Sequence, residues 1–271
     1  MITDNHTLIH PVIGIVGLGV VGGAIASAIN NRVTKIDINP EKNNGTYSDL
    51  LNCDGVFVCV PSPTSINGHC DTSILEQVLE KLSAMNYSGV IISKVTAPPS
   101  VYSMLASKYK NLVYSPEFLT EASAGSDYLH ATKAIIGGRV TAYVNEAERI
   151  MSYCQTNLRT IIKCSIESAA LTKYTVNAFL ALKVVFMNEI CQLATASNIE
   201  YDDIALMMSE DARIGTSHLR VPGPDGKFGF GGMCFPKDTE ALLKYAESVN
   251  IELSVLTAAV KKNTFLRLQD K

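Results

Sequence analysis

One cysteine, Cys234, lies in a stretch of sequence that favours a reactive thiolate. Three glycines stand in the five residues before it and allow the backbone to come close to a ligand. Pro236 then opens a run over residues 237–249 with apolar residues at helical spacing, and proline is well tolerated in the first turn of a helix. Cys234 is therefore expected just before a helix N-terminus, where the helix dipole and Lys237 favour the thiolate. The alternative is a buried structural cysteine beside a flexible turn.

Lys173 and Asn177 form a second candidate pair. They stand four residues apart in a stretch, residues 165–198, that contains neither proline nor glycine and is expected to be one long helix. Both side chains then lie on one helical face, where they are either catalytic or part of a solvated surface. At 1.5 Å per residue the helix is roughly 50 Å long, which predicts that it spans two domains or forms a dimer interface.

A glycine-rich turn near the N-terminus has the pattern of a dinucleotide-binding loop. An apolar run, residues 12–16, leads into G-x-G-x-x-G and then into a segment of helical length. Gly17 would make the tight turn, Gly19 would admit a pyrophosphate, and Gly22 would let helix and strand pack closely. Asp37, 20 residues after Gly17, fits the acid that binds the adenosine ribose and favours NAD over NADP. The predicted NAD-binding residues are Gly17, Leu18, Gly19, Val20, Val21, Gly22, Asp37, Lys42, Val60, Pro61 and Thr96.

Strand and helix patterns alternate over residues 12–162 and predict an α/β fold. We expect a Rossmann-type doubly wound parallel sheet, followed by a long central helix and an all-α domain. The expected domains are residues 1–164, which bind NAD, and residues 165–271, which carry the cysteine and dimerise. Because such sheets bind ligands beyond the strand C-termini, the informative segments are residues 61–64, 94–98 and 115–121. A loop rich in glycine and proline, residues 221–232, is expected to be mobile and to cover a ligand.

Composition narrows the class of protein. The chain has 271 residues, 47% of them hydrophobic and 18% charged, which is typical of a globular protein of one or two domains. A net charge of −3 gives no electrostatic reason to bind nucleic acid or an anionic membrane surface. The polar first ten residues and the lack of a long apolar run predict a cytoplasmic protein. Seven cysteines without regular spacing predict reduced thiols, and no metal motif is present.

Five separated segments together resemble the UDP-glucose/GDP-mannose dehydrogenase family, the nucleotide-sugar 6-dehydrogenases. Their order and approximate spacing match the family from residue 12 to about residue 269, and the segment that contains Cys234 is the most specific. The segments are residues 17–22, Lys94-Val95-Thr96-Ala97-Pro98, Ser115-Pro116-Glu117-Phe118-Leu119-Thr120-Glu121, Lys173-Tyr174-Thr175-Val176-Asn177, and residues 229–238.

This resemblance implies two NAD-dependent oxidations of a nucleotide sugar, with UDP-glucose the expected substrate and UDP-glucuronate the product. Cys234 would carry first a thiohemiacetal and then a thioester. Lys173 and Asn177 would stabilise the oxyanion or its water, and Lys173 would also move a proton. The other catalytic residues implied are Glu117 for thioester hydrolysis, Asp238 for orientation and Thr96 for the water network. The implied substrate-binding residues are Glu121, Arg213 from a partner subunit, Gly231 and Lys237.

Two features depart from the family pattern. The link over residues 222–229 is longer than usual, and the second α/β domain, which supplies much of the nucleotide pocket, does not follow, so we expect a short form without the C-terminal UDP-binding domain. Two alternatives stay open: a β-hydroxyacid-type dehydrogenase with one hydride transfer, and a non-catalytic NAD-binding subunit of a longer partner. A homodimer through the long helix is expected because that helix exposes more apolar surface than one copy can cover.

Overall fold

The computed structural model describes residues 10–29, 33–65 and 67–268. The chain divides into two compact units. The first comprises Met1–Pro63 and Asp71–Lys173, and the second comprises Thr64–Cys70 and Tyr174–Lys271. Each unit has a core of its own. A domain boundary between residues 164 and 165 stays a prediction.

The first unit is built on one sheet, in which the described residues form seven strands in the order β2-β1-β3-β4-β5-β6-β7. Neighbouring strands are parallel except β5 and β6, which pair antiparallel. The doubly wound Rossmann-type fold is thus confirmed, as a mostly parallel sheet. The strands are β1 (Ile13–Val16), β2 (Val33–Ile36), β3 (Gly55–Val58), β4 (Val90–Ser93), β5 (Leu112–Tyr114), β6 (Lys133–Gly138) and β7 (Thr160–Cys164).

The antiparallel pair follows from the connection between β5 and β6. This connection contains η3 (Glu121–Ser123) and the short helix α4 (Ala124–His130), which packs against α1 (Val20–Ala28). A parallel strand would require the chain to cross back to the opposite end of the sheet. Because the chain stays at the end where β5 finishes, β6 begins there and runs in the reverse direction.

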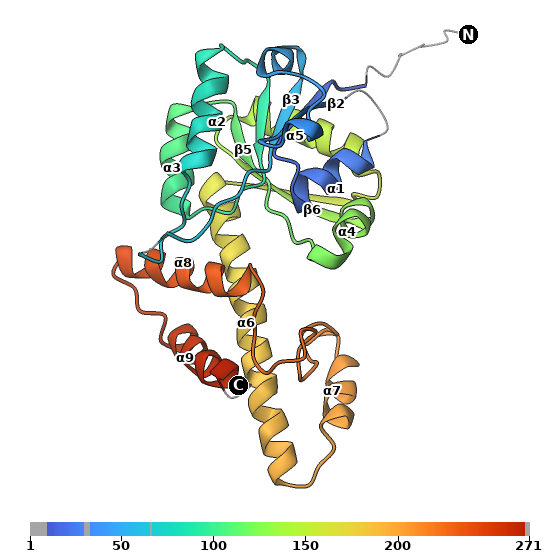
Figure 1. The fold of residues 1–271 in the computed structure, drawn as a ribbon, viewed down its shortest axis with the longest axis vertical. Coiled ribbons are helices and arrows are strands. Elements are labelled where there is room, and N and C mark those ends of the chain that lie inside the picture. The colour runs from blue at the N-terminus through green and yellow to red at the C-terminus, as the bar shows by residue number, and fades with distance from the viewer. Residues whose placement is uncertain (1–9, 30–32, 66, 269–271) are drawn as a thin grey trace, which may run out of the picture. The chain divides into compact units, whose positions relative to one another are not determined.

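Helices cover both faces of the sheet (Figure 1). All residues of β1, β3 and β4 are buried, and apart from Ser93 at the end of β4 these strands contain no polar residue. Ile15 and Phe57 pack on one face with α1, α4 and α5 (Thr141–Cys154). On the other face lie α2 (Ser73–Ala84) and α3 (Pro99–Lys108), where Tyr102 of α3 stacks on Tyr114 of β5 with ring centroids 4.3 Å apart. Two short 3₁₀ helices, η1 (Pro40–Lys42) and η2 (Tyr47–Asn52), connect β2 to β3.

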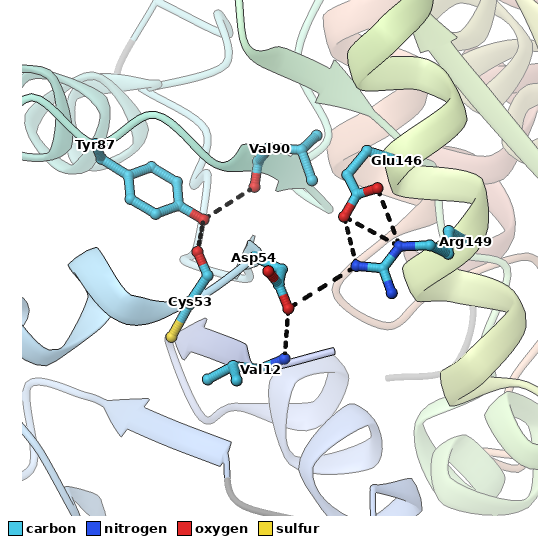
Figure 2. A network of polar contacts seen from close by, with 7 residues as sticks. All are labelled: Val12, Cys53, Asp54, Tyr87, Val90, Glu146 and Arg149. Atoms are coloured by element: carbon cyan, nitrogen blue, oxygen red, sulfur yellow. Dashed lines mark hydrogen bonds and ion pairs between the residues drawn. The ribbon is translucent and has the colours of Figure 1, made fainter. Parts of the chain in front are cut away.

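A polar network ties the amino ends of β1, β3 and β4 to α5 (Figure 2). The carboxylate of Asp54 accepts a hydrogen bond from the backbone N–H of Val12 at 2.8 Å and lies 3.8 Å from the guanidinium of Arg149. Arg149 also pairs with Glu146 at 2.6 Å, and the hydroxyl of Tyr87 donates to the carbonyl of Cys53 at 3.1 Å. These contacts stabilise the amino edge of the sheet and leave its carboxyl edge to other segments.

The expected long helix is confirmed as α6 (Ile166–Ala196), 31 residues in one continuous element (Figure 1). It begins in the first unit and continues into the second. In the part of the chain that the structure describes, α6 is the one helix whose length and apolar composition would allow it to cross a membrane. Tyr174 and Met187 on this helix are fully buried in protein, and the helix supplies core residues, as expected of a core helix.

The second unit packs α7 (Tyr201–Ser209), α8 (Phe235–Ser248) and α9 (Ser254–Leu268) against α6. One cluster joins Tyr174 of α6 to Leu242 of α8 and Leu256 of α9, and Cys70 contacts it. A second cluster joins Met187 of α6 to Tyr201 of α7. The all-α region expected after the long helix is confirmed.

Candidate active site

The three glycines of the first turn have different surroundings. Gly17 follows β1 with a φ of +92°, and a Cβ on it would lie 2.7 Å from the carbonyl oxygen of Cys59. A Cβ on Gly22 would lie 1.8 Å from the carbonyl oxygen of Gly17. Nothing lies within 4 Å of a Cβ built on Gly19, which is the N-cap of α1. The turn therefore needs glycine at 17 and 22 for packing, and it leaves open space at 19 where the helix presents its first N–H groups.

Asp37 and Lys42 border this turn. Asp37 accepts hydrogen bonds from the backbone N–H of Asn39 at 2.9 Å and of Leu18 at 2.5 Å. These bonds, that from Asn39 first, hold the pKa of the Asp37 carboxyl below its usual value, and the charge of Lys42 acts in the same direction. Lys42 Nζ donates to the carbonyl of Leu18 at 3.0 Å. A fixed carboxylate, ionised at neutral pH, thus stands beside the glycine turn.

The carboxyl ends of β1, β3 and β4 adjoin one another. The strand order reverses at β1, which lies between β2 and β3, and open α/β sheets bind ligands at such a point. Val60 and Pro61 follow β3, and the backbone N of Val60 would lie 3.0 Å from a Cβ on Gly17. Ser62 donates to the carbonyl of Thr96, after β4, at 2.8 Å. The structure therefore brings the glycine turn, residues 60–62 and Thr96 to one edge of the first unit.

A buried ion pair lies at this same edge. The ammonium of Lys94 pairs with the carboxylate of Glu117 and donates to the hydroxyl of Ser115 at 3.0 Å. The side chain of Lys94 is 1% exposed and that of Glu117 is 13% exposed. Sequence reasoning selected Glu117 but not the side chain of Lys94. The available signal was a lysine directly after the buried strand β4, where a charge needs a partner.

Glu121 and Lys173 complete the candidate residues of the first unit. Glu121 is exposed and borders a hollow of about 470 Å³ together with Val20 and Gly23 of α1. The ammonium of Lys173 lies 5.0 Å from the ring centroid of Phe118, the residue after Glu117. Glu121, predicted to bind substrate, is thus a neighbour of Val20, predicted to bind cofactor.

A second group of candidate residues surrounds the start of α8, in the second unit. Cys234 is the N-cap of this helix and is exposed, which confirms its expected place before a helix. Asp238, in the first turn, is buried and accepts a hydrogen bond from Asn177 Nδ2 of α6 at 2.5 Å. Its other oxygen pairs with Lys237 Nζ at 2.6 Å. The Asn177–Asp238 bond therefore fixes the first turn of α8, and with it the backbone of Cys234, against α6.

Two buried asparagines hold the segment that precedes the cysteine. Asn188 of α6 accepts a hydrogen bond from the N–H of Gly229 at 3.0 Å. Asn263 of α9 accepts one from the N–H of Phe230 at 2.6 Å and donates to the carbonyl of Phe230 at 3.0 Å. A Cβ on Gly231 would lie 1.5 Å from the guanidinium of Arg267, so a larger residue there would have to displace the end of that side chain. The C-terminal end of the loop expected to be mobile is thus tied to two helices, and sequence reasoning missed both asparagines.

Comparison with known proteins matches two successive segments of the chain to two domains of one protein family. Residues 43–155 match the NAD binding domain of the UDP-glucose/GDP-mannose dehydrogenase family, and residues 167–264 match its central domain. The chain belongs to this family.

The names of individual relatives support this family assignment. A putative UDP-glucose 6-dehydrogenase, YtcA of Bacillus subtilis (strain 168), is 34% identical over 223 residues, which are 78% of this chain and 50% of that protein. The chain spans about half the length of the curated relatives it matches.

Two solved structures share the fold at low sequence identity. The UDP-glucose dehydrogenase from Pyrobaculum islandicum matches with a TM-score of 0.81 at 22% identity, over 98% of this chain and 70% of that one. The 3-hydroxyisobutyrate dehydrogenase of Mycobacterium tuberculosis matches with a TM-score of 0.72 at 14% identity, over 95% of this chain and 94% of that one.

Arg213 lies in a separate groove of the second unit. Its exposed guanidinium pairs with Asp211 at 2.5 Å. It lines an apolar groove of about 610 Å³ between α6, α7 and α9, and neither Cys234 nor Asn177 is among the lining residues. Within the described ranges, no group of three or more His, Cys, Asp and Glu side chains could hold a metal ion.

Proposed function

We propose that this chain oxidises a nucleotide sugar, UDP-glucose to UDP-glucuronate, in two NAD-dependent steps. The observation that carries the proposal is the Asn177–Asp238 bond, which holds an exposed cysteine at the start of α8 against the helix that also bears Lys173. Family membership supports it, as do the names of relatives called UDP-glucose 6-dehydrogenase. As part of this proposal, the candidate residues of the first unit and those of the second unit act on the same substrate molecule.

The residues of the first unit fit NAD. Gly17, Gly19 and Gly22, with the first N–H groups of α1 at Val20 and Val21, would take the pyrophosphate. Asp37 would bind the adenosine ribose hydroxyls, with Leu18 and Lys42 beside it. Ile38, which sequence reasoning missed, is 99% exposed next to Asp37 and offers an apolar side chain to the adenine base. When bound, NAD accepts the hydride at each oxidation.

In the first oxidation, Lys173 would take the proton of the sugar hydroxyl. The sulfur of Cys234 would then add to the aldehyde carbon, which forms the C–S bond of a thiohemiacetal. Lys173 and Asn177, one helical turn apart on α6, would donate to the oxygen that becomes negative. Asp238 would keep the amide of Asn177 oriented. Loss of the second hydride leaves a thioester on Cys234.

Hydrolysis of the thioester needs a base. The carboxylate of Glu117 would take a proton from water as the water oxygen attacks the carbonyl carbon. The C–S bond then breaks and the electron pair returns to the sulfur of Cys234. Thr96 would hold the water. Glu121, Gly231 and Lys237 would bind the substrate, with Arg213 supplied by a second copy.

Turnover tests the proposal directly. Purified protein with UDP-glucose and NAD is expected to yield two NADH for each sugar consumed. Cys234→Ser is expected to form no thioester and release no uronic acid, whereas Cys164→Ser, a change in β7 at the end of the sheet, is expected to keep full activity. A protein that binds NAD but forms no NADH with UDP-glucose or another nucleotide sugar would contradict the proposal and favour a non-catalytic NAD-binding subunit.

A single-step β-hydroxyacid dehydrogenase is the second candidate function. The likeness to 3-hydroxyisobutyrate dehydrogenase favours it, because that fold match covers 94% of the other chain. Such an enzyme transfers one hydride and needs no cysteine nucleophile. One NADH per substrate, with Cys234→Ser fully active on a β-hydroxyacid, would select this function.

We also propose that two copies associate through α6. The groove of about 610 Å³ is lined by apolar side chains of α6, α7 and α9, and among them Phe179 and Phe186 are more than half exposed. Its charged lining residues are Lys183, Glu189, Arg213 and Lys262, so across a two-fold axis Glu189 of each copy can face a cation of the other. The cytoplasm is the proposed location, since the reaction consumes NAD.

A further inference from the structure

Hydrogen bonds hold the backbone of Lys94 and the residues directly before and after it. The N–H of Lys94 donates to the carbonyl of Val58 in β3 at 2.9 Å, at the carboxyl end of β4. The hydroxyl of Tyr102 lies 2.7 Å from the hydroxyl of Ser93 and donates to the carbonyl of Val95 at 2.5 Å. One buried tyrosine thus holds the residues before and after Lys94. The direction of the lysine side chain is set by the sheet and by α3.

The ammonium of Lys94 is buried, and among the described residues Glu117 is the one that pairs with it and carries the opposite charge. The ammonium lies 5.8 Å from the ring centroid of Phe57 and 3.0 Å from the hydroxyl of Ser115. Burial raises the pKa of the neighbouring Cys59 thiol to about 12, with Lys94 acting against this, so the thiol is neutral at pH 7. Among the residues that the structure describes, Glu117 is the carboxylate that pairs with Lys94. A buried charge is tolerated only when it is paired and hydrogen-bonded, so Glu117 and Ser115 are the partners that allow Lys94 to be buried.

The two partners differ in access to solvent. The side chain of Glu117 is 13% exposed, whereas that of Lys94 is 1% exposed. Glu117 can therefore meet a water molecule, and Lys94 can act only through Glu117. A general base must be deprotonated and correctly oriented at the moment the water attacks.

We propose that Lys94 is a positioning residue for thioester hydrolysis: it holds and orients the Glu117 carboxylate. This inference rests on the proposed function. In the step concerned, the water oxygen bonds to the thioester carbon, the C–S bond breaks with its electrons returning to the sulfur of Cys234, and Glu117 accepts the proton. The oxidations precede this step and need neither Lys94 nor Glu117.

The experiment compares K94M and E117Q with K108M. Lys108 pairs with Glu80 at 2.6 Å on the exposed surface of the same unit and serves as the matched control. Rapid mixing with UDP-glucose and NAD is expected to give a burst of two NADH per site in all three variants. Steady-state turnover is expected to fall at least about 100-fold in E117Q, the usual contribution of a general base. It should fall at least about 10-fold in K94M, and not at all in K108M.

One readout separates positioning from a purely structural role. Intact-mass spectrometry is expected to find an acyl adduct on Cys234 in K94M and E117Q, because hydrolysis is slow and the oxidations are not. Equal loss of burst and turnover, with no adduct, would overturn the inference.

A double variant covers the case in which K94M does not fold. K94M/E117Q has no unpaired buried charge, and it is expected to turn over at the rate of E117Q, because Lys94 acts only through Glu117. A further loss of ten-fold or more relative to E117Q would overturn the inference. A wild-type protein that makes no NADH would overturn the proposed function and this inference with it, which distinguishes that outcome from the failure of Lys94 alone.

Discussion

Three glycines in one turn are required for different reasons, and this can be tested residue by residue. Gly22 → Ala would place a methyl group 1.8 Å from the carbonyl oxygen of Gly17, whereas Gly19 → Ala meets nothing within 4 Å. We expect G22A to lower the free energy of unfolding by about 1–3 kcal/mol, as overpacking does. We expect G19A to keep the stability of the fold and lose affinity for NAD, because its methyl group occupies the space left for the pyrophosphate. Urea denaturation and NAD titration of both variants check this, and equal stability of G22A and G19A would contradict it.

His218 provides a second test at this scale. Its ring lies against Phe235, with centroids 5.4 Å apart, and its Nδ1 is buried with no hydrogen-bond partner among the described residues. Burial lowers the pKa of His218 below 6.5, and the charge of Lys183 lowers it further. At pH values between the lowered pKa of His218 in the folded chain and its pKa in the unfolded chain, the unfolded chain binds a proton that the folded chain does not. The contribution of His218 to stability is therefore complete above about pH 6.5 and is lost as the pH falls below it.

His218→Asn is expected to remove this part of the pH dependence. Asparagine tolerates the left-handed backbone of residue 218, whose φ is +64°, and it does not titrate. Thermal melts between pH 8 and pH 5 are expected to show a smaller loss of stability on acidification in H218N than in the wild type. His69→Asn, at an exposed site, is the control and should follow the wild type. Parallel curves for H218N and wild type would contradict the assignment.

At the scale of elements, periodicity predicted the alternation of strands and helices and the long helix, and the features it missed have physical causes. α4 has seven residues and lies in a segment with glycine and serine, too short for an apolar repeat to show. The reversed direction of β6 depends on where the preceding chain runs, which no local pattern records. Cys234 could be placed before a helix because proline and helical spacing are local signals. The Lys94–Glu117 and Asn263–Phe230 contacts could not be predicted from local signals, because they join residues that stand 23 and 33 positions apart in the sequence.

The segment before Cys234 is expected to depend on Asn263. Asn263→Ala would leave the buried N–H and carbonyl of Phe230 without their side-chain partner, at a cost of about 1–3 kcal/mol in the free energy of unfolding. Hydrogen exchange of the amides of residues 229–232 is expected to accelerate, and Cys234 should react faster with a thiol reagent. Thr264→Ala, next to it on the exposed side of α9, is the control and should change stability by less than about 0.5 kcal/mol. Unchanged exchange in N263A would show that other contacts hold the segment.

At the scale of the whole molecule, α6 connects two units that have separate cores. Residues 166–173 belong to the first unit and residues 174–196 to the second, so the predicted oxyanion residues Lys173 and Asn177 lie on either side of the division. The length of α6 was evident from the absence of proline and glycine. The division within it was not, because burial against two cores looks in sequence like one continuous apolar helix.

The groove beside α6 leads to the last prediction. Phe179 and Phe186 stand seven residues apart on α6, hence on one face, and both line the groove. If a second copy covers them, wild-type protein is expected to be a dimer by light scattering at tens of micromolar, and F179E/F186E a monomer with an unchanged circular dichroism spectrum. Met104→Glu, an exposed apolar residue of α3 in the first unit, is the control and should stay dimeric. A monomeric wild type, or a variant that remains dimeric, would place the association elsewhere and remove the proposed role of Arg213, because that role requires the groove to face the partner.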